Sequence, residues 1–176
     1  MSSRLMLALV TVGLQLTLVA AAGVASQPAQ TGLQPTAART IAPDFALPDA
    51  RGDRVALSRY KGRVVLLDFW ATWCTGCKVE IPWYIEFQKV YASQGLTSIG
   101  AAMDDEGWAK VKPYLAEHPI PYSIVIGNPD LVQPYDIKNL PVTLLIDRRG
   151  RIADAHAGVV DKEKWEQEIR QLLRER

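Results

Sequence analysis

Apolar residues cluster along this chain in runs that predict a buried β-sheet. The clearest run is RVVLLDFW at residues 63–70, where β-branched and aromatic side chains follow one another almost without interruption. Such a run is typical of a strand that is buried on both faces. LTSIGAAM at residues 96–103 has the same character. We therefore expect these two segments to form the centre of a sheet.

Helical periodicity follows each of these two segments. Residues 74–93 have a helical pattern that Pro82 interrupts, and residues 106–118 form an amphipathic pattern that ends before Pro119. A last helix is expected after Asp161, whose side chain is a good N-cap. The chain thus alternates between strands and helices.

Short strands and turns account for most of the remaining domain. YSIVIG at residues 122–127 predicts a short strand, and residues 142–158 predict a strand, a turn and a second strand. Residues 42–62 suggest another hairpin that turns at Arg51-Gly52-Asp53. A strand–helix–strand unit followed by a hairpin and a helix predicts an α/β fold with mixed strand directions.

The first 25 residues have a different pattern from the rest. Arg4 is followed by an uncharged, largely apolar stretch, residues 5–25, which ends in small residues. This predicts a signal peptide that is cut after Ala25; an uncleaved anchor is the alternative, because 21 residues also suffice to span a bilayer. Residues 26–40 are rich in Pro, Gln, Thr and Ala and predict a flexible linker, which leaves residues 41–176 as one exported domain.

Composition and charge narrow the functional class. The chain has 176 residues, of which 48% are hydrophobic and 22% charged, as in an ordinary soluble domain with an added leader. Without Arg4 the basic and acidic side chains are equal in number. There is no run of basic residues, so the sequence gives no support for nucleic-acid binding through phosphate neutralisation.

The two cysteines, Cys74 and Cys77, are separated only by Thr75 and Gly76. A disulfide that closes so short a loop removes little entropy from the unfolded chain, so stability alone does not explain it. In an oxidising compartment the pair is better interpreted as a redox group. Cys74 lies where a helix should begin, and the helix N-terminus would favour its thiolate. We therefore expect Cys74 to be the nucleophile and Cys77 the resolving thiol.

Two other interpretations of the cysteine pair remain open. A zinc site would need two more ligands, and the two histidines, His118 and His156, stand alone in their segments. An inert structural disulfide is the second alternative. The sequence therefore predicts neither a metal ion nor a cofactor.

The segment LLDFWATWCTGCKVEIP resembles the active-site strand and helix of the thioredoxin superfamily, most closely its exported TlpA-like/ResA-like thiol–disulfide oxidoreductases. The resemblance covers about residues 42–176 and includes APDFAL before the motif and NLPVTLLIDRRGRI after it. It implies a thioredoxin-like fold, with a central mixed β-sheet flanked by helices, an N-terminal hairpin extension and an inserted α/β segment.

The resemblance also implies a surface for substrate binding. Pro141 would be a cis proline beside the cysteine pair, and the backbone next to it, at Leu140, would pair with the substrate chain. Trp73 would help to shape this surface. Two departures from the family are Gly76, where proline is frequent, and Val142, where threonine is more frequent.

Two carboxylates are further candidates for the site. Glu80 follows Cys77 by three residues on the same helix face, and the resemblance implies that it tunes the thiols and relays a proton. Asp68 lies inside the apolar run and matches a buried aspartate of thioredoxin that is thought to take the proton of the resolving thiol; many ResA-like proteins have asparagine there. The alternatives are a solvated glutamate and an aspartate bonded to water or backbone.

The sequence thus predicts an exported, periplasmic thiol–disulfide oxidoreductase. The resemblance implies that it reduces disulfides of exported proteins, including apocytochromes c, with electrons from a membrane donor. A peroxiredoxin-like peroxidase is one alternative, although Ala71 and Leu67 stand where such enzymes have threonine and proline. A non-catalytic module, either a copper-binding protein or a chaperone, is another.

Overall fold

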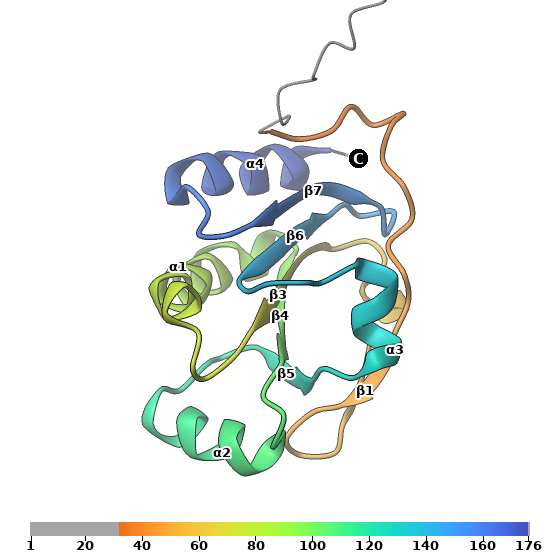
Figure 1. Cartoon of the computed structure of the whole chain (residues 1–176). Helices are drawn as coiled ribbons and strands as arrows, with labels where there is room; N and C mark the ends of the chain where they lie inside the picture. Colours follow the sequence, from red (N-terminus) through yellow and green to blue (C-terminus); the bar gives the residue numbers. More distant parts are fainter. Residues whose placement is uncertain (1–31, 176) are drawn as a thin grey trace, which may run out of the picture. The chain divides into compact units, whose positions relative to one another are not determined.

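The structure, a computed structural model, describes residues 32–175 and is built around a five-stranded sheet in the order β5-β4-β3-β6-β7 (Figure 1). Its strands are β3 (Val64–Trp70), β4 (Leu96–Ala102), β5 (Ser123–Ile126), β6 (Val142–Ile146) and β7 (Ile152–Ala157). Strands β3, β4 and β5 run parallel, β6 is antiparallel to β3, and β7 is antiparallel to β6. This mixed sheet confirms the predicted α/β, thioredoxin-like fold class.

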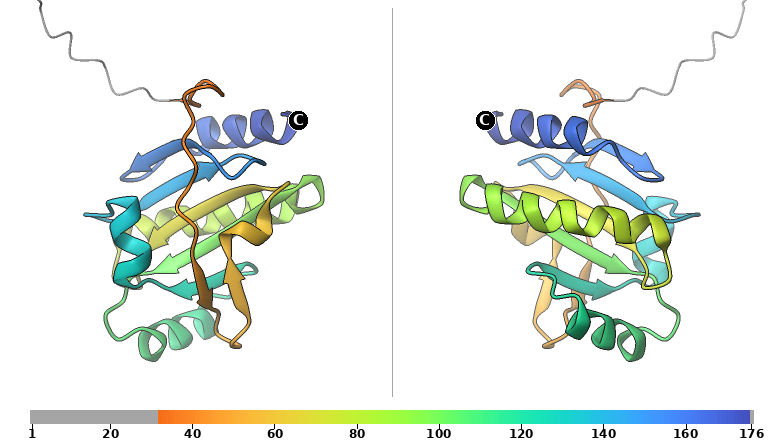
Figure 2. Two further views of the ribbon diagram at one scale, coloured as in Figure 1. Left: turned by 90° about the vertical axis from the view of Figure 1, so that its right-hand side faces the viewer. Right: turned by 90° about the vertical axis from the view of Figure 1, so that its left-hand side faces the viewer.

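Helices and a small hairpin cover both faces of the sheet (Figures 1 and 2). Helices α1 and α4 lie on one face, while α3 and the hairpin of β1 and β2 lie on the other; α2 lies near the β5 edge. The helices are α1 (Thr75–Tyr91), α2 (Trp108–Glu117), α3 (Pro129–Val132) and α4 (Lys162–Arg174), the hairpin strands are β1 (Ala46–Pro48) and β2 (Arg54–Ala56), and the 3₁₀ turns are η1 (Leu57–Tyr60), η2 (Ala92–Gln94) and η3 (Gln133–Tyr135).

The side chains of β3 divide between the two faces, as the period of a strand requires. Leu67 and Phe69 join the core under the hairpin and α3, whereas Leu66 joins the core under α1 and α4. Trp70 packs with the first turns of α1 and with α2. Asp68, between Leu66 and Trp70 in the alternation, therefore faces α1 from the middle of the sheet.

Most predicted elements are confirmed, with small differences. Helix α1 continues through Pro82, where the sequence predicted an interruption. As predicted, Asp161 caps α4, and its side chain accepts a hydrogen bond from Lys164 N at 2.8 Å. The sequence analysis did not predict α3, a single turn that Asn128 caps by accepting from Leu131 N. A turn this short has almost no hydrophobic period to detect.

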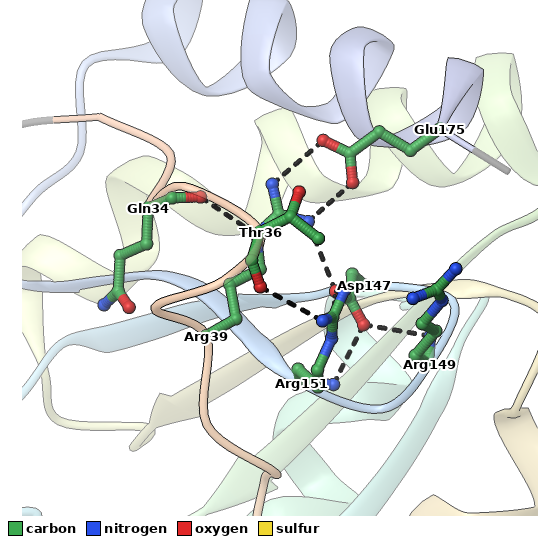
Figure 3. A network of polar contacts seen from close by, with 7 residues as sticks. All are labelled: Gln34, Thr36, Arg39, Asp147, Arg149, Arg151 and Glu175. Carbon is green, nitrogen blue, oxygen red and sulfur yellow. Dashed lines mark hydrogen bonds and ion pairs between the residues drawn. The ribbon is translucent and has the colours of Figure 1, made fainter.

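Residues 34–39 make polar contacts with the domain, although they fall in the expected linker of residues 26–40 (Figure 3). Arg39 pairs with Asp147 at 3.2 Å and with both Glu175 oxygens at 2.5 and 2.9 Å. Arg151 binds Asp147 as well, at 2.7 Å. Two backbone oxygens add to these contacts: Gln34 O accepts a hydrogen bond from Arg39 Nε, and Thr36 O accepts one from Arg151 Nη1. We call this set of contacts the Arg39 network.

The Arg39 network lies at the end of the sheet opposite the cysteine pair. Asp147 directly follows β6, whose last residue, Ile146, pairs with Val65 near the start of β3. The cysteines follow the other end of β3. None of the helices in residues 32–175 is both long and apolar enough to cross a membrane. The predicted leader, residues 1–25, lies outside the described residues.

Candidate active site

Cys74 and Cys77 form a disulfide at the junction of β3 and α1, with their Cα atoms 5.3 Å apart. Cys74 is the N-cap of α1, and its Sγ accepts a hydrogen bond from Cys77 N at 3.1 Å. Cys77 is fully buried, while Cys74 keeps 5% of its surface exposed. The helix N-terminus and the Cys77 N–H both favour negative charge on the Cys74 sulfur, as expected for a nucleophile.

The loop that leads into Cys74 is held by a residue that the sequence analysis did not identify. Asp104, buried just after β4, accepts hydrogen bonds from Thr72 N at 3.0 Å and from Thr72 Oγ1 at 2.5 Å. Cys74 N in turn donates to Ala71 O at 3.1 Å. Asp104 thereby fixes the position from which Trp73 and Cys74 are presented. Its signal in the sequence is weak, because one acidic residue after a strand is common.

The loop before β6 lies against the first turn of α1. The Leu140–Pro141 peptide bond is cis, as the resemblance implied. Pro141 O accepts a hydrogen bond from Gly158 N at 2.9 Å, which joins this loop to the one after β7. A Cβ at Gly76 would stand 3.0 Å from Val159 Cγ2 and 3.2 Å from Pro141 Cδ. The glycine between the cysteines is therefore explained by this close packing.

An apolar rim lies beside the disulfide. Trp73 is 64% exposed and Val159 44% exposed, and Leu140, in the loop before β6, is partly buried. Val159 was not among the predicted site residues, because nothing in the sequence shows that its loop reaches Gly76. Exposed large apolar side chains that gather at one place are typical of an interaction surface.

Asp68 is buried beneath this surface without a charged partner. It is 1% exposed, and neither of its carboxylate oxygens has a hydrogen-bond partner among residues 32–175. Burial raises the pKa of Asp68 well above its ordinary value, and the charge of Glu80 raises it further, while the Thr143 hydroxyl lowers it slightly. The predicted burial of Asp68 is thus confirmed, and its carboxyl group is poised to hold a proton.

Glu80 is also fully buried, which contradicts the alternative of a solvated glutamate. Its Oε1 accepts a hydrogen bond from Val160 N at 2.7 Å, whereas Oε2 has no partner within the described part of the chain. Burial raises the pKa of Glu80, and the bond from Val160 N and the nearby Tyr84 hydroxyl offset part of that rise. The charges of Asp68 and Glu80 interact, so the two carboxyls form one buried acidic pair.

Tyr84 extends this buried polar group, although the sequence analysis did not identify it as a site residue. Its hydroxyl lies 2.9 Å from Thr143 Oγ1, and Thr143 is the ladder partner of Asp68 on β6. Burial raises the pKa of Tyr84 well above its ordinary value, and the charges of Asp68 and Glu80 add to the rise. The spacing of four residues from Glu80, on the same face of α1, was the signal that could have revealed it.

The described residues contain no group of three or more His, Cys, Asp or Glu side chains that could hold a metal ion. Sulfur and carboxyl groups make up this site. A thiol pair at a helix N-terminus, with two buried carboxyls of raised pKa nearby, is suited to exchange of disulfide bonds.

Comparison with known proteins supports this interpretation. Residues 38–155 match the model of the AhpC/TSA family. The thiol-disulfide oxidoreductase ResA of Geobacillus kaustophilus is 34% identical over 134 residues, which cover 76% of each chain. The thioredoxin-like protein YneN of Bacillus subtilis is 31% identical over 129 residues, or 73% of this chain and 76% of YneN.

A solved structure agrees with these relatives. The thiol:disulfide interchange protein of the thioredoxin family from Chlorobium tepidum is 28% identical and has a TM-score of 0.71, with 77% of this chain and 97% of that one covered. The fold, the cysteine pair and the similar proteins all indicate the same kind of protein. The chain belongs to the AhpC/TSA family and is a thioredoxin-like thiol–disulfide oxidoreductase.

Proposed function

We propose that the chain works as a reductase of disulfides in exported proteins, with Cys74 as the attacking thiol and Cys77 as the resolving thiol. The observation that carries this proposal is the buried acidic pair, Asp68 and Glu80, beneath the disulfide. Nearby carboxylates disfavour thiolates in the reduced protein, whereas strong oxidants have a stabilised reduced form. The reduced pair should therefore give up its electrons readily.

In the first step the Cys74 thiolate attacks one sulfur of the client disulfide. A bond forms between Cys74 Sγ and that sulfur, the client S–S bond breaks, and the other client sulfur leaves as a thiolate that takes a proton from water. The client chain is held on Trp73 and on the backbone of Leu140 and Pro141. The exposed side chains of the apolar rim support this placement.

In the second step Cys77 releases the client. Its thiol transfers a proton to the Asp68 carboxylate, and the resulting thiolate attacks Cys74 Sγ. The Cys74–Cys77 bond forms, the bond to the client breaks, and the client leaves with both cysteines reduced. Glu80 adjusts the proton affinity of Asp68 through its charge. A raised pKa makes Asp68 a better proton acceptor for a thiol than an ordinary aspartate.

The oxidised pair must then be reduced again, and we infer a membrane-bound thiol donor as the source of the two electrons. The leader at residues 1–25 supports export to the periplasm, with a membrane tether if it is not cut. Apocytochromes c are proposed as clients because their paired cysteines must be reduced before haem attachment. These assignments follow from the resemblance to ResA-like proteins.

The equilibrium potential of the Cys74–Cys77 pair tests the direction of the reaction. In glutathione or dithiothreitol buffers we expect a value below the glutathione range of about −220 to −260 mV. A value near about −120 mV, typical of a strong oxidant, would instead make the chain a disulfide donor. Consumption of peroxide by the reduced protein, without exchange with protein disulfides, would favour the peroxidase alternative.

A trapping experiment tests the assignment of the two thiols. Cys77→Ser should accumulate a mixed disulfide between Cys74 and an oxidised client peptide, because the resolving thiol is missing. Cys74→Ser, the matched control, should trap none. Equal trapping by both variants would contradict the assigned order of attack.

A further inference from the structure

Two buried hydroxyl groups accompany the acidic pair. Tyr84 Oη and Thr143 Oγ1 lie 2.9 Å apart, and both side chains are fully buried. Either oxygen is able to donate this hydrogen bond, because a hydroxyl is both a donor and an acceptor. The bond therefore joins α1 to β6 inside the domain in one of two directions.

Each of the two hydroxyls adjoins a different carboxyl. Thr143 is the ladder partner of Asp68, so the two side chains stand next to each other on one face of the sheet. Tyr84 follows Glu80 by four residues and shares its face of α1. The pKa shifts agree with this placement, because the Thr143 hydroxyl lowers the pKa of Asp68 and the Tyr84 hydroxyl lowers that of Glu80. The order across the interior is thus Asp68, Thr143, Tyr84 and Glu80.

Both carboxyls have acceptor oxygens to spare. Glu80 Oε1 accepts from Val160 N, whereas Glu80 Oε2 and both oxygens of Asp68 have no hydrogen-bond partner among residues 32–175. A buried carboxylate without a donor costs free energy. Whichever carboxyl is ionised therefore gains most from the neighbouring hydroxyl.

A count of hydrogens shows that the two hydroxyls cannot serve both carboxyls at once. Each hydroxyl carries one hydrogen, and the bond between Tyr84 and Thr143 uses one of the two. If Tyr84 donates to Thr143, the hydrogen that remains is on Thr143, beside Asp68. If Thr143 donates to Tyr84, the hydrogen that remains is on Tyr84, beside Glu80. The pair has one hydrogen to offer.

From this count we propose that Tyr84 and Thr143 are positioning residues that act as one shared donor, which stabilises either Asp68 or Glu80 at a time. The inference rests on the proposed role of Asp68 as proton acceptor. While Asp68 is ionised, Tyr84 donates to Thr143 and Thr143 donates to Asp68. Once Asp68 has taken the proton of Cys77, both O–H groups rotate and Tyr84 donates to Glu80. No covalent bond changes in this rotation, since each hydrogen stays on its own oxygen.

The rotation favours completion of the resolving step. A donor beside a carboxylate stabilises the ionised form, so its departure makes Asp68 hold the proton of Cys77 more firmly. The same hydrogen then stabilises negative charge on Glu80. The shared donor thereby follows the negative charge from one carboxyl to the other.

Other ionisable groups on this face of the sheet do not replace the two hydroxyls. His156 on β7 is the other ladder partner of Thr143, and Tyr122 lies before β5, where burial and then the Asp68 charge raise its pKa. Neither of them shifts the pKa of Asp68 or Glu80. The hydroxyls of the shared donor are thus the side-chain groups whose loss should move those two values.

Site-resolved titration of Asp68 and Glu80 in the oxidised protein, by carbon-detected NMR of the carboxyl groups, tests the shared donor. Thr143→Val removes the donor of Asp68, so the Asp68 midpoint should rise by about half a pH unit or more. Tyr84→Phe removes the donor of Glu80 and leaves the Thr143 hydrogen to Asp68 alone. The Glu80 midpoint should then rise and the Asp68 midpoint should fall.

The opposite signs of the two Asp68 shifts distinguish a shared donor from a merely polar environment. If the hydroxyls only stabilised charge independently, both substitutions would raise the Asp68 midpoint. Two rises, or no shift in either variant, would overturn the proposal. Glu80 titrates in the same spectra, so its charge during the titration of Asp68 is known at each pH. If Thr143→Val folds poorly, Tyr84→Phe alone still predicts shifts of opposite sign at the two carboxyls.

Two control variants complete the titration. Tyr91→Phe removes another buried tyrosine hydroxyl from α1, one that contacts Glu166 and Arg170, and should leave both midpoints within about 0.2 pH units. Thr143→Ser keeps the hydroxyl and should keep the midpoints of the unmodified chain. A shift in Thr143→Ser as large as that in Thr143→Val would show that packing and not the hydroxyl is responsible, and would overturn the proposal.

The pH profile of client release separates this inference from the proposed function. The midpoint of release from Cys74 should follow that of Asp68, upward in Thr143→Val and downward in Tyr84→Phe. Shifted carboxyl midpoints with an unshifted release profile would contradict Asp68 as the base, which is the proposed function, and leave the shared donor intact. Unshifted carboxyl midpoints would overturn the shared donor whatever the rate of release.

Discussion

Asp147 and Asp68 are both almost fully buried, at 3% and 1% exposure, yet their surroundings differ completely. Asp147 is held between Arg39 and Arg151 in the Arg39 network and also accepts backbone N–H bonds from Arg149 and Arg151 (Figure 3). Neither oxygen of Asp68 has a partner in good hydrogen-bond geometry among the described residues, no positive charge lies beside it, and only the Thr143 hydroxyl lowers its pKa. At opposite ends of one sheet, the pKa of the same residue type is shifted in opposite directions.

The pKa values follow from this difference. Bonds from Arg151, Arg39 and the backbone lower the pKa of Asp147 despite its burial, whereas burial and the Glu80 charge raise the pKa of Asp68. A carboxylate with all its bonds made stabilises the fold but has no proton to exchange. A carboxyl left without partners costs stability but is able to accept and release a proton. The comparison thus separates a structural carboxylate from the carboxyl that we propose to be functional.

The largest effect on stability is expected at the Arg39 network. Asp147→Ala would leave Arg39 and Arg151 without their shared partner, and we expect the unfolding free energy at pH 7 to fall by about 3–5 kcal/mol. Urea denaturation measures this loss. Arg51→Gln, which removes the ion pairs of an exposed arginine with Asp49 and Asp53, is the control. A loss below about 1 kcal/mol for Asp147→Ala would show that the network does not hold the domain together.

The largest effect on activity is expected at Asp68. Asp68→Asn keeps the shape of the side chain but removes the proton acceptor, so release of the client from Cys74 should slow by about 100-fold. Rapid-quench analysis of the mixed disulfide measures this step, and the unfolding free energy should not fall. Unchanged release would contradict the role of Asp68 as base, and a large loss of stability would contradict the absence of partners.

Stability should depend on pH in opposite directions at the two sites. For Asp68, whose folded pKa is raised, the contribution is complete below about pH 3.8 and is lost as pH rises through the folded pKa, by about 1.4 kcal/mol per pH unit. For Asp147, whose folded pKa is lowered, the contribution is present above about pH 3.8 and is lost as pH falls through the folded pKa.

Differences in unfolding free energy between the unmodified chain and each asparagine variant measure these two slopes. Asp68→Asn should become relatively more stable than the unmodified chain as pH rises above about 4, whereas the stability deficit of Asp147→Asn should shrink as pH falls below about 4. Parallel curves for the two variants would contradict the comparison.

Glu80 should have a smaller effect than Asp68. Glu80→Gln retains a side-chain oxygen that is able to accept the bond from Val160 N, so the fold should be kept while the charge near Asp68 is lost. We expect the pH midpoint of client release to move down and the rate near neutral pH to fall by about tenfold. An unchanged midpoint would show that Glu80 does not act on Asp68.

The smallest effect is expected at an exposed ion pair. Lys110 and Glu106 lie 3.8 Å apart on the surface, each with 58% of its side chain exposed. Lys110→Gln should change the unfolding free energy by less than about 0.5 kcal/mol. A larger change would show that exposure is a poor guide to the energy of ion pairs in this protein.

The sequence was sufficient to predict one of the two compared sites. Asp68 interrupts an apolar run six residues before Cys74, so its burial and its place near the disulfide follow from local pattern. Arg39, by contrast, lies in a polar stretch, and its partners are 108 and 136 residues away. The periodicity of hydrophobic residues within a segment does not indicate contacts with residues so distant in the sequence. Composition alone therefore indicated a linker where the structure has a buried ion pair.

The sequence was also insufficient to predict which side chains from different loops meet at the site. Val159, Pro141 and Gly76 meet only because the loops before β6 and after β7 both return to the first turn of α1. Periodicity assigns a face to each residue of a strand, but it does not say which strands are neighbours.

The most direct test of this account is a site-resolved titration of Asp68 and Asp147 in the same oxidised protein, by carbon-detected NMR of the side-chain carboxyl groups. We expect Asp68 to titrate well above the ordinary aspartate value of 3.8 and Asp147 to titrate below it. Two midpoints that both lie near 3.8 would contradict the division between a functional and a structural carboxyl.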